Sequence, residues 1–226
     1  MKPQARHLSL LRHRGASMLV ALFALVLILL GAAALVRSVD TSTLIAGNLA
    51  FKQDTTESAG VGSEQAIAWI ESKMNTEPSS FFESDYAAAG YYATSMENLD
   101  PTGANTSSSN KLRLVDWDDD NCASATSGSY LDCTLKPWGN TSAITVNGNS
   151  VKWIIMRLCK DVGPMTTINW CSKPPATTAS GSANERGELS SGGRIAGTES
   201  GPYFRIIVRT IGPRGTASFT ETIIHF

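Results

Sequence analysis

An apolar run near the N-terminus limits what this chain can do more than any other feature. Residues 16–36 contain no charged residue and no proline. As a helix that rises ~1.5 Å per residue, the run is roughly 30 Å long, which matches the hydrocarbon core of a bilayer. It is typical of a cleaved secretion signal, of a plain membrane anchor, or of a helix kept in the mature protein after cleavage just before it.

A basic segment precedes the apolar run. Residues 1–15 contain Lys2, Arg6, Arg12 and Arg14 but no acidic residue, so the positive-inside rule predicts that they stay in the cytoplasm. Without these four, the 226-residue chain has 15 basic and 20 acidic residues. Because such a domain lacks the basic surface of a nucleic-acid-binding protein, we expect no direct contact with nucleic acid.

The residues after the run separate the three interpretations. A secretion signal would use residues 19–30 as its apolar core and the alanines at 32–34 as its cleavage site. Residues 37–74, however, contain no proline and place apolar residues near helical spacing, as at Leu44 and Ile70. This continuity argues against a signal that is cut away.

The pattern predicts one long helix over residues 16–76 that ends before Pro78. Its first part, residues 16–36, is apolar all round and is expected to cross the membrane. Its second part is amphipathic and is expected to pack on a globular head formed by residues 77–226.

Three segments carry a family resemblance. The basic leader closes on Arg14-Gly15 directly before the apolar run, and residues 46–48 read Ala-Gly-Asn. Residues 203–223 form the third segment, two β-rich runs around a Gly-Pro-Arg turn. Together they resemble the type IV pilins, and among these the PilX-type minor pilins. Residues 79–200 carry no such resemblance.

The resemblance implies a pilin fold and a pathway of assembly. A prepilin peptidase would cut after Gly15, and Ala16 would be N-methylated. The protein would sit in the inner membrane before assembly and then in the pilus at the cell surface, at the tip. Its partners would be other minor pilins and the major pilin, bound through the N-terminal helix, together with a tip adhesin. It would initiate, prime or cap a type IV pilus that serves adhesion, twitching motility or DNA uptake.

Val20 departs from the wider pilin pattern. Major pilins have a glutamate at the fifth mature residue, which is thought to neutralise the N-terminal amine of a neighbouring subunit in the apolar filament core. An unpaired charge is costly there, so a subunit without the carboxylate suits the tip better than the shaft. Alternatively, Val20 is an ordinary lipid-facing residue of an anchor.

The head is predicted to be α+β, with about four antiparallel strands packed on the amphipathic part of the helix. Asn147-Gly148 lies between two β-rich runs and predicts a hairpin, and residues 212–215 predict a second one. Residues 111–117 could add a strand. The Ser-, Thr-, Gly- and Pro-rich residues 172–200 are expected to form a long exposed loop.

The four cysteines favour two disulfides, because their number is even and the domain is expected to be exported. Three pairings are possible. We prefer Cys122–Cys133 and Cys159–Cys171, each of which closes a short loop worth roughly 3 kcal/mol. No histidine or C-x-x-C pattern accompanies them, so a zinc site is not expected.

One acidic segment has the spacing of a calcium-loop start. Asp116, Asp118 and Asp120 alternate, but Asn121 stands where such a loop needs glycine and Ser127 where it needs glutamate. A solvated acidic turn is the preferred interpretation. Two aromatic pairs, at residues 81–82 and 91–92, are expected to be core residues where the helix joins the head.

Nothing in the sequence predicts an enzyme or a cofactor. After removal of the leader only His225 remains of the three histidines, and no hydrolase, metalloprotease or P-loop motif occurs. Two rivals to the minor-pilin interpretation remain. One is a pseudopilin of a type II secretion system, and the other is a membrane-anchored or secreted periplasmic binding domain.

Overall fold

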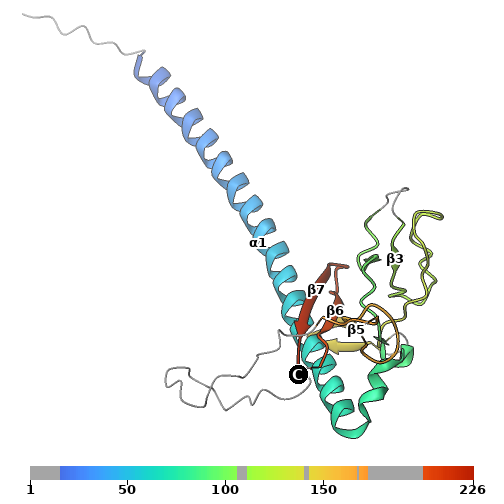
Figure 1. The fold of residues 1–226 in the computed structure, drawn as a ribbon. Helices are drawn as coiled ribbons and strands as arrows, with labels where there is room; N and C mark the ends of the chain where they lie inside the picture. Colours follow the sequence, from blue (N-terminus) through green and yellow to red (C-terminus); the bar gives the residue numbers. More distant parts are fainter. Residues whose placement is uncertain (1–15, 106–110, 140–142, 167, 173–200) are drawn as a thin grey trace, which may run out of the picture. The chain divides into compact units, whose positions relative to one another are not determined.

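The computed structural model describes residues 16–105, 111–139, 143–166, 168–172 and 201–226. They form an α+β fold with one long N-terminal helix, α1 (Ala16–Thr76), and a mixed sheet (Figure 1). The chain divides into two compact units, Met1–Ala50 and Phe51–Phe226. The second unit includes residues 51–76 of α1, which contribute to its core.

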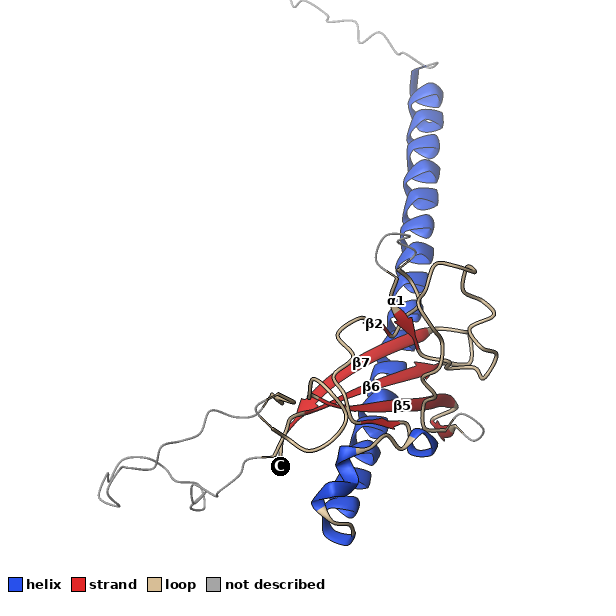
Figure 2. Ribbon diagram, turned by 45° about the vertical axis from the view of Figure 1, so that its right-hand side comes forward, coloured by secondary structure: helices blue, strands red, loops and turns tan. Residues whose placement is uncertain are grey.

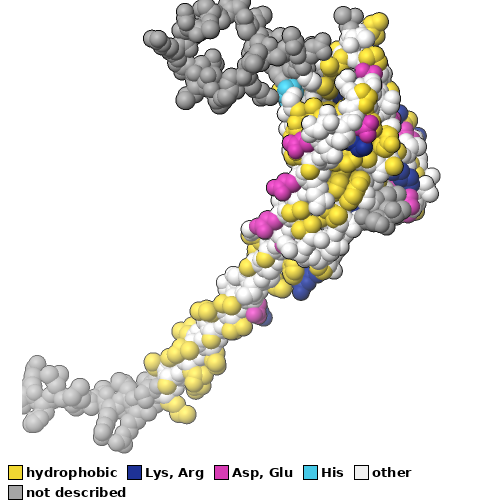
Figure 3. All heavy atoms as spheres, turned by 90° about the horizontal axis from the view of Figure 1, so that it is seen from below, with side chains coloured by type: hydrophobic (Ala, Val, Ile, Leu, Met, Phe, Trp, Pro, Cys, Tyr) yellow, Lys and Arg dark blue, Asp and Glu magenta, His cyan; other side chains and the backbone are white. Residues whose placement is uncertain are grey.

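The described residues of the first unit, 16–50, form the first part of α1. Its large apolar side chains are exposed to the surroundings, and Figure 3 shows them as a nearly continuous apolar surface along the helix. By length and composition this part of the helix can cross a membrane. Large apolar side chains remain exposed beyond residue 36, at Val39, Leu44, Ile45 and Leu49.

The main sheet of the second unit is built around two hairpins (Figure 2). The first joins β4 (Ile144–Val146) to β5 (Asn149–Arg157), and the second joins β6 (Phe204–Ile211) to β7 (Ala217–Ile224). β5 and β6 pair antiparallel between them. Asn147 and Gly148 both have positive φ, 51° and 84°, as a tight two-residue turn requires.

The sheet contains four antiparallel strands, as expected, but it is mixed rather than purely antiparallel. A fifth strand, β1 (Tyr91–Tyr92), runs parallel to β5 with Tyr91 opposite Ile155. The chain reaches β1 through two short 3₁₀ helices, η1 (Ser79–Glu83) and η2 (Ala87–Ala89). Only Arg113–Leu114 of residues 111–117 form a strand, β3, which pairs with β2 (Leu99–Asp100) in a separate two-stranded sheet.

Both faces of the main sheet are covered. On one face, Ala59, Ala66 and Ile70 of α1 pack with Val151, Trp153 and Ile155 of β5 and with Ile206 and Val208 of β6. On the other face, Ile154 and Met156 of β5 pack with side chains from residues 92–135. Because successive side chains of a strand point to opposite faces, β5 is apolar on both.

The helix approaches the sheet closely at Gly62. A Cβ atom there would lie 2.6 Å from Cγ1 of Val151, closer than two carbon atoms can pack. Nearer to Phe51 the contact is polar, since the Asn149 amide donates to Asp54 (2.7 Å) and to Ser58 (2.8 Å). Small residues and paired polar groups thus fix where the helix lies on the sheet.

Candidate functional site

The predicted processing site lies at the start of α1. Gly15 falls outside the described residues, and Ala16 is the first residue of the helix. Val20 is 68% exposed and lies in the apolar segment, with no acidic residue from Ala16 to residue 36. Cleavage after Gly15, methylation of Ala16 and a role for Val20 at a filament tip stay predictions.

The acidic turn at residues 116–120 is organised by cations of the protein itself. Asp116 is fully buried and accepts hydrogen bonds from Lys136 Nζ and from the backbone N–H groups of Asp120 and Asn121. Burial raises the pKa of its carboxyl, but these hydrogen bonds outweigh that effect and bring the pKa below its ordinary value. The sequence suggested a solvated acidic turn. In the structure, the Asp116 side chain of this turn is buried and hydrogen-bonded within the protein.

Asp118 has a different partner from Asp116. Both of its carboxylate oxygens lie 2.9 Å from Nη1 of Arg209. The side chains of Asp116 and Asp118 thus bind separate cationic groups instead of converging on one point. Asp116 does lie near Cys122 and Cys133, but these cysteines form a disulfide and offer no thiolate to a metal.

The structure joins the cysteines in the two nearest-neighbour pairs, Cys122–Cys133 and Cys159–Cys171. The second disulfide closes a loop that is held by Asn169. Its side chain accepts from the Asp161 N–H and donates to the carbonyls of Gly163 and Pro164. The loop nevertheless exposes Val162, Met165, Ile168 and Trp170. The loop is fixed internally while these large apolar side chains stay partly exposed.

Aromatic residues gather where α1 ends, as expected for the pairs at 81–82 and 91–92. Tyr91, Tyr92 and Phe82 are buried and Phe81 is half-buried. Phe82 packs edge-on against Tyr91 and Phe204, with ring centroids 5.5 Å apart in both cases. The Tyr91 hydroxyl donates to the Phe82 carbonyl at 2.7 Å, which satisfies its polar atom.

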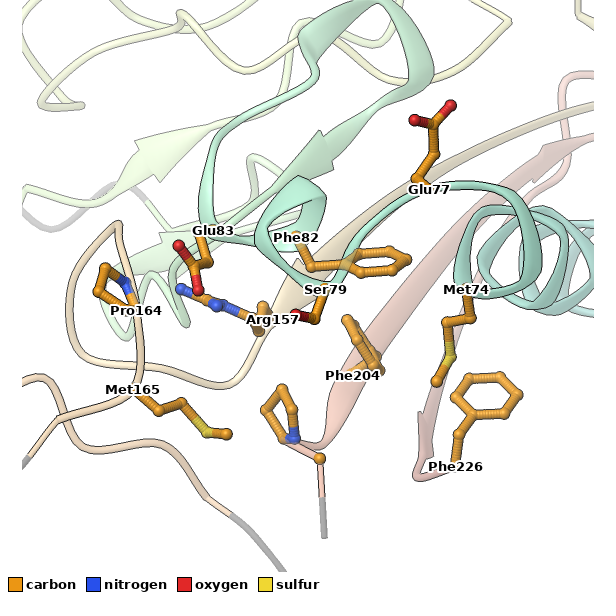
Figure 4. A pocket seen from close by; sticks show the side chains of 12 residues that line it. Met74, Glu77, Ser79, Phe82, Glu83, Arg157, Pro164, Met165, Phe204 and Phe226 are labelled. Carbon is orange, nitrogen blue, oxygen red and sulfur yellow. The ribbon is translucent and has the colours of Figure 1, made fainter. Parts of the chain in front are cut away.

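A cavity opens beside this aromatic cluster (Figure 4). Its volume is about 410 Å³, within the range of pockets that hold small ligands. Most of the wall is apolar and comes from Met74, Phe82, Pro164, Met165, Pro202, Phe204 and Phe226. The polar side chains are those of Glu77, Ser79, Glu83 and Arg157. No pattern in the sequence predicted this cavity.

Arg157 is the most unusual residue of the cavity, because it is a cation that is only 3% exposed. Its Nε donates to the Ala93 carbonyl at 3.2 Å and its Nη2 to the Gly163 carbonyl at 2.6 Å. Burial lowers the pKa of the guanidinium, an effect that the charges of Glu83 and Asp85 partly oppose. None of the ion pairs within the described part of the chain involves Arg157.

One feature of the sequence could have identified Arg157 as a candidate site residue. Arg157 is the single charged residue in the apolar segment 153–159, whose first five residues end the central strand β5. A charge at such a place is expensive unless it has a partner or a role. His225, the remaining histidine, lies at the end of the chain with its ring 5.1 Å from that of Tyr203. The expectation that the protein is not an enzyme stays a prediction.

Comparison of the chain with models of protein families, with curated proteins and with solved structures finds no match.

Proposed function

We propose that this protein is a minor pilin that helps to initiate, prime or cap a type IV pilus. The observation that carries the proposal is a single helix with two environments. Residues 51–76 pack on the sheet through Ala59, Ala66 and Ile70, whereas the apolar side chains before Ala50 are exposed. A subunit whose apolar helix is buried only by neighbouring helices has this distribution.

The exposed side chains beyond residue 34 argue against a secreted domain. Cleavage after the alanines at 32–34 would leave Leu35, Val36, Val39, Leu44, Ile45 and Leu49 on one helix in water, each at least half exposed. Large apolar side chains exposed in that number on one helical segment indicate a site of association or of membrane contact.

The same side chains argue against a plain anchor. Arg37 and Asp40 end the uncharged segment, so a bilayer accounts for residues up to about 36. The apolar residues at 39–49 lie past that point and need another apolar cover. Helices of other pilus subunits would supply it, in the way that helices pack through apolar stripes in a bundle.

Val20 supports a place at the filament tip rather than along the shaft. A valine cannot neutralise the N-terminal amine of a neighbouring subunit, and an unpaired amine in an apolar filament core is unfavourable. A subunit at the tip has no such neighbour above it. A pseudopilin of a type II secretion system would share this helix, and the location of the protein separates the two functions.

Immunogold labelling of sheared filaments tests the proposal. We expect the native protein to be scarce relative to the major pilin and to label filament tips, and we expect its deletion to reduce the number of surface pili. Unchanged piliation in the deletion strain, with a loss of protein secretion instead, would favour the pseudopilin. Even labelling along filaments would contradict the tip location.

A further inference from the structure

We propose that the cavity beside the end of α1 binds a carboxylate attached to an apolar body, with Arg157 as the group that recognises the carboxylate. This proposal does not depend on the pilus function. It rests on the position of Arg157, on the apolar wall and on the volume of about 410 Å³.

Arg157 is a buried cation whose hydrogen-bond donors are only partly used. It is only 3% exposed. Among the described residues it donates hydrogen bonds through Nε and Nη2, and both acceptors are neutral carbonyls. A guanidinium has five N–H donors in a planar fork. Burial without an ionic partner is costly, so an anion that reaches the remaining donors gains more here than at an exposed arginine.

Two hydrogen bonds hold the Arg157 guanidinium in place. Its bond to Gly163 ties it to the disulfide-closed loop, and its bond to Ala93 ties it to the segment that follows β1. The Gly163 N–H in turn donates to the Glu83 carbonyl at 2.8 Å. A fixed fork matches a carboxylate better than a flexible ammonium does, because two parallel hydrogen bonds can form at once.

The wall of the cavity is mainly apolar and suits the apolar body of such a ligand. Figure 4 shows Met74, Phe204 and Phe226 on one side of the cavity and Met165 near Pro164 on another. Methionine and phenylalanine side chains accommodate apolar groups of varied shape. A ligand with an aromatic or aliphatic body would bury apolar surface against them while its carboxylate approaches Arg157.

The charge of Glu83 makes the direction of a change in ligand affinity a test of the proposal. Its carboxylate interacts electrostatically with Arg157 but does not form one of the ion pairs of the described residues. An incoming carboxylate competes with it and is repelled by it. Removal of the Glu83 charge should therefore strengthen the binding of an anion, whereas it would weaken the binding of a cationic or amine-bearing ligand.

The test measures binding to the full chain in detergent by isothermal titration calorimetry. The probes are 3-phenylpropionate and its amide, and a hexapeptide ending in phenylalanine with a free or an amidated C-terminus. We expect each acid to bind at least about 10-fold more tightly than its amide, since charge-assisted hydrogen bonds are roughly twice as strong as neutral ones. A preference for the peptide acid identifies a protein C-terminus as the ligand, and a preference for phenylpropionate identifies a small acid.

Two variants complete the test without touching the bonds of Arg157. Glu83→Gln should raise the affinity for both acids about 3- to 10-fold, because it removes a like charge from the wall of the cavity. Glu71→Gln makes the same change at an exposed helix position outside the cavity and should leave the affinity unchanged. Equal binding of acid and amide, no binding of either acid, or weaker binding by Glu83→Gln would overturn the proposal.

Discussion

The two parts of α1 have the same backbone conformation and opposite environments. Residues 51–76 place Thr55, Ser58, Ala59, Ala66 and Ile70 against the sheet, and all of these are buried. Residues 18–49 bury none of their large apolar side chains within the protein. The difference indicates that the globular unit stabilises only its own part of the helix. The other part depends on whatever surrounds it, whether lipid or other helices.

A charge placed in each part of α1 should have the largest effect in one part and almost none in the other. Ile70→Asp puts a carboxylate into a fully buried apolar site and should lower the free energy of unfolding of the globular unit by more than about 4 kcal/mol. Leu44→Asp, at an exposed position, should change it by less than about 0.5 kcal/mol. Tryptophan fluorescence during denaturation of the full chain in detergent measures both values.

The same pair of variants separates folding from assembly. Leu44→Asp should reduce the recovery of the protein in sheared filaments, because it puts a carboxylate on the surface that neighbouring helices are proposed to cover. Equal unfolding effects of the two substitutions would show that the two parts of α1 do not differ in the way described.

A smaller effect comes from two glycines of the helix. Gly62→Ala places a methyl group 2.6 Å from Val151 Cγ1 and 2.9 Å from Val208 Cγ1, so overpacking should cost about 1–3 kcal/mol of stability. Gly47→Ala meets nothing within 4 Å and should favour the helix by up to about 1 kcal/mol. Thermal unfolding followed by circular dichroism distinguishes the opposite signs, and a stabilising Gly62→Ala would contradict the close packing.

The parts of the fold that were predicted correctly are those with local signals. An unbroken helical pattern marks α1, and Asn147-Gly148 marks the β4–β5 turn because both residues accept positive φ. The parallel pairing of β1 with β5 could not be predicted, since it joins two-residue and nine-residue strands far apart in the sequence. The cavity is non-local in the same way, and the long loop expected at residues 172–200 lies almost wholly outside the described residues.

The candidate residues likewise divide into those with local sequence signals and those that depend on contacts between distant segments. Sequence spacing indicated the cysteine pairs, but it could not show that Lys136 reaches Asp116 from 20 residues away or that Arg209 reaches Asp118. Both contacts form only when the sheet brings distant segments together. Arg157 was not predicted as a site residue because the sequence does not show whether a strand arginine is exposed to solvent or buried. Only the structure shows that it is buried.

The smallest effect on the globular unit is expected from Val20→Glu. The change lies in the exposed part of the helix and should leave the unfolding of residues 51–226 unchanged. Its insertion cost should be only ~2–3 kcal/mol, since the residue lies near the end of the apolar segment. If the missing carboxylate limits incorporation, immunogold labelling should spread from the tip along the shaft. Unchanged labelling would contradict the role given to Val20.

We propose that the exposed part of α1 remains in the mature protein, where other helices cover it. Mass spectrometry of the mature N-terminus tests it most directly. We expect an N-terminus at Ala16 that carries one methyl group, after cleavage between Gly15 and Ala16. An N-terminus at Leu35 would show that the apolar segment is a removed signal, and an intact leader starting at Met1 would show a plain anchor; either result would contradict the account.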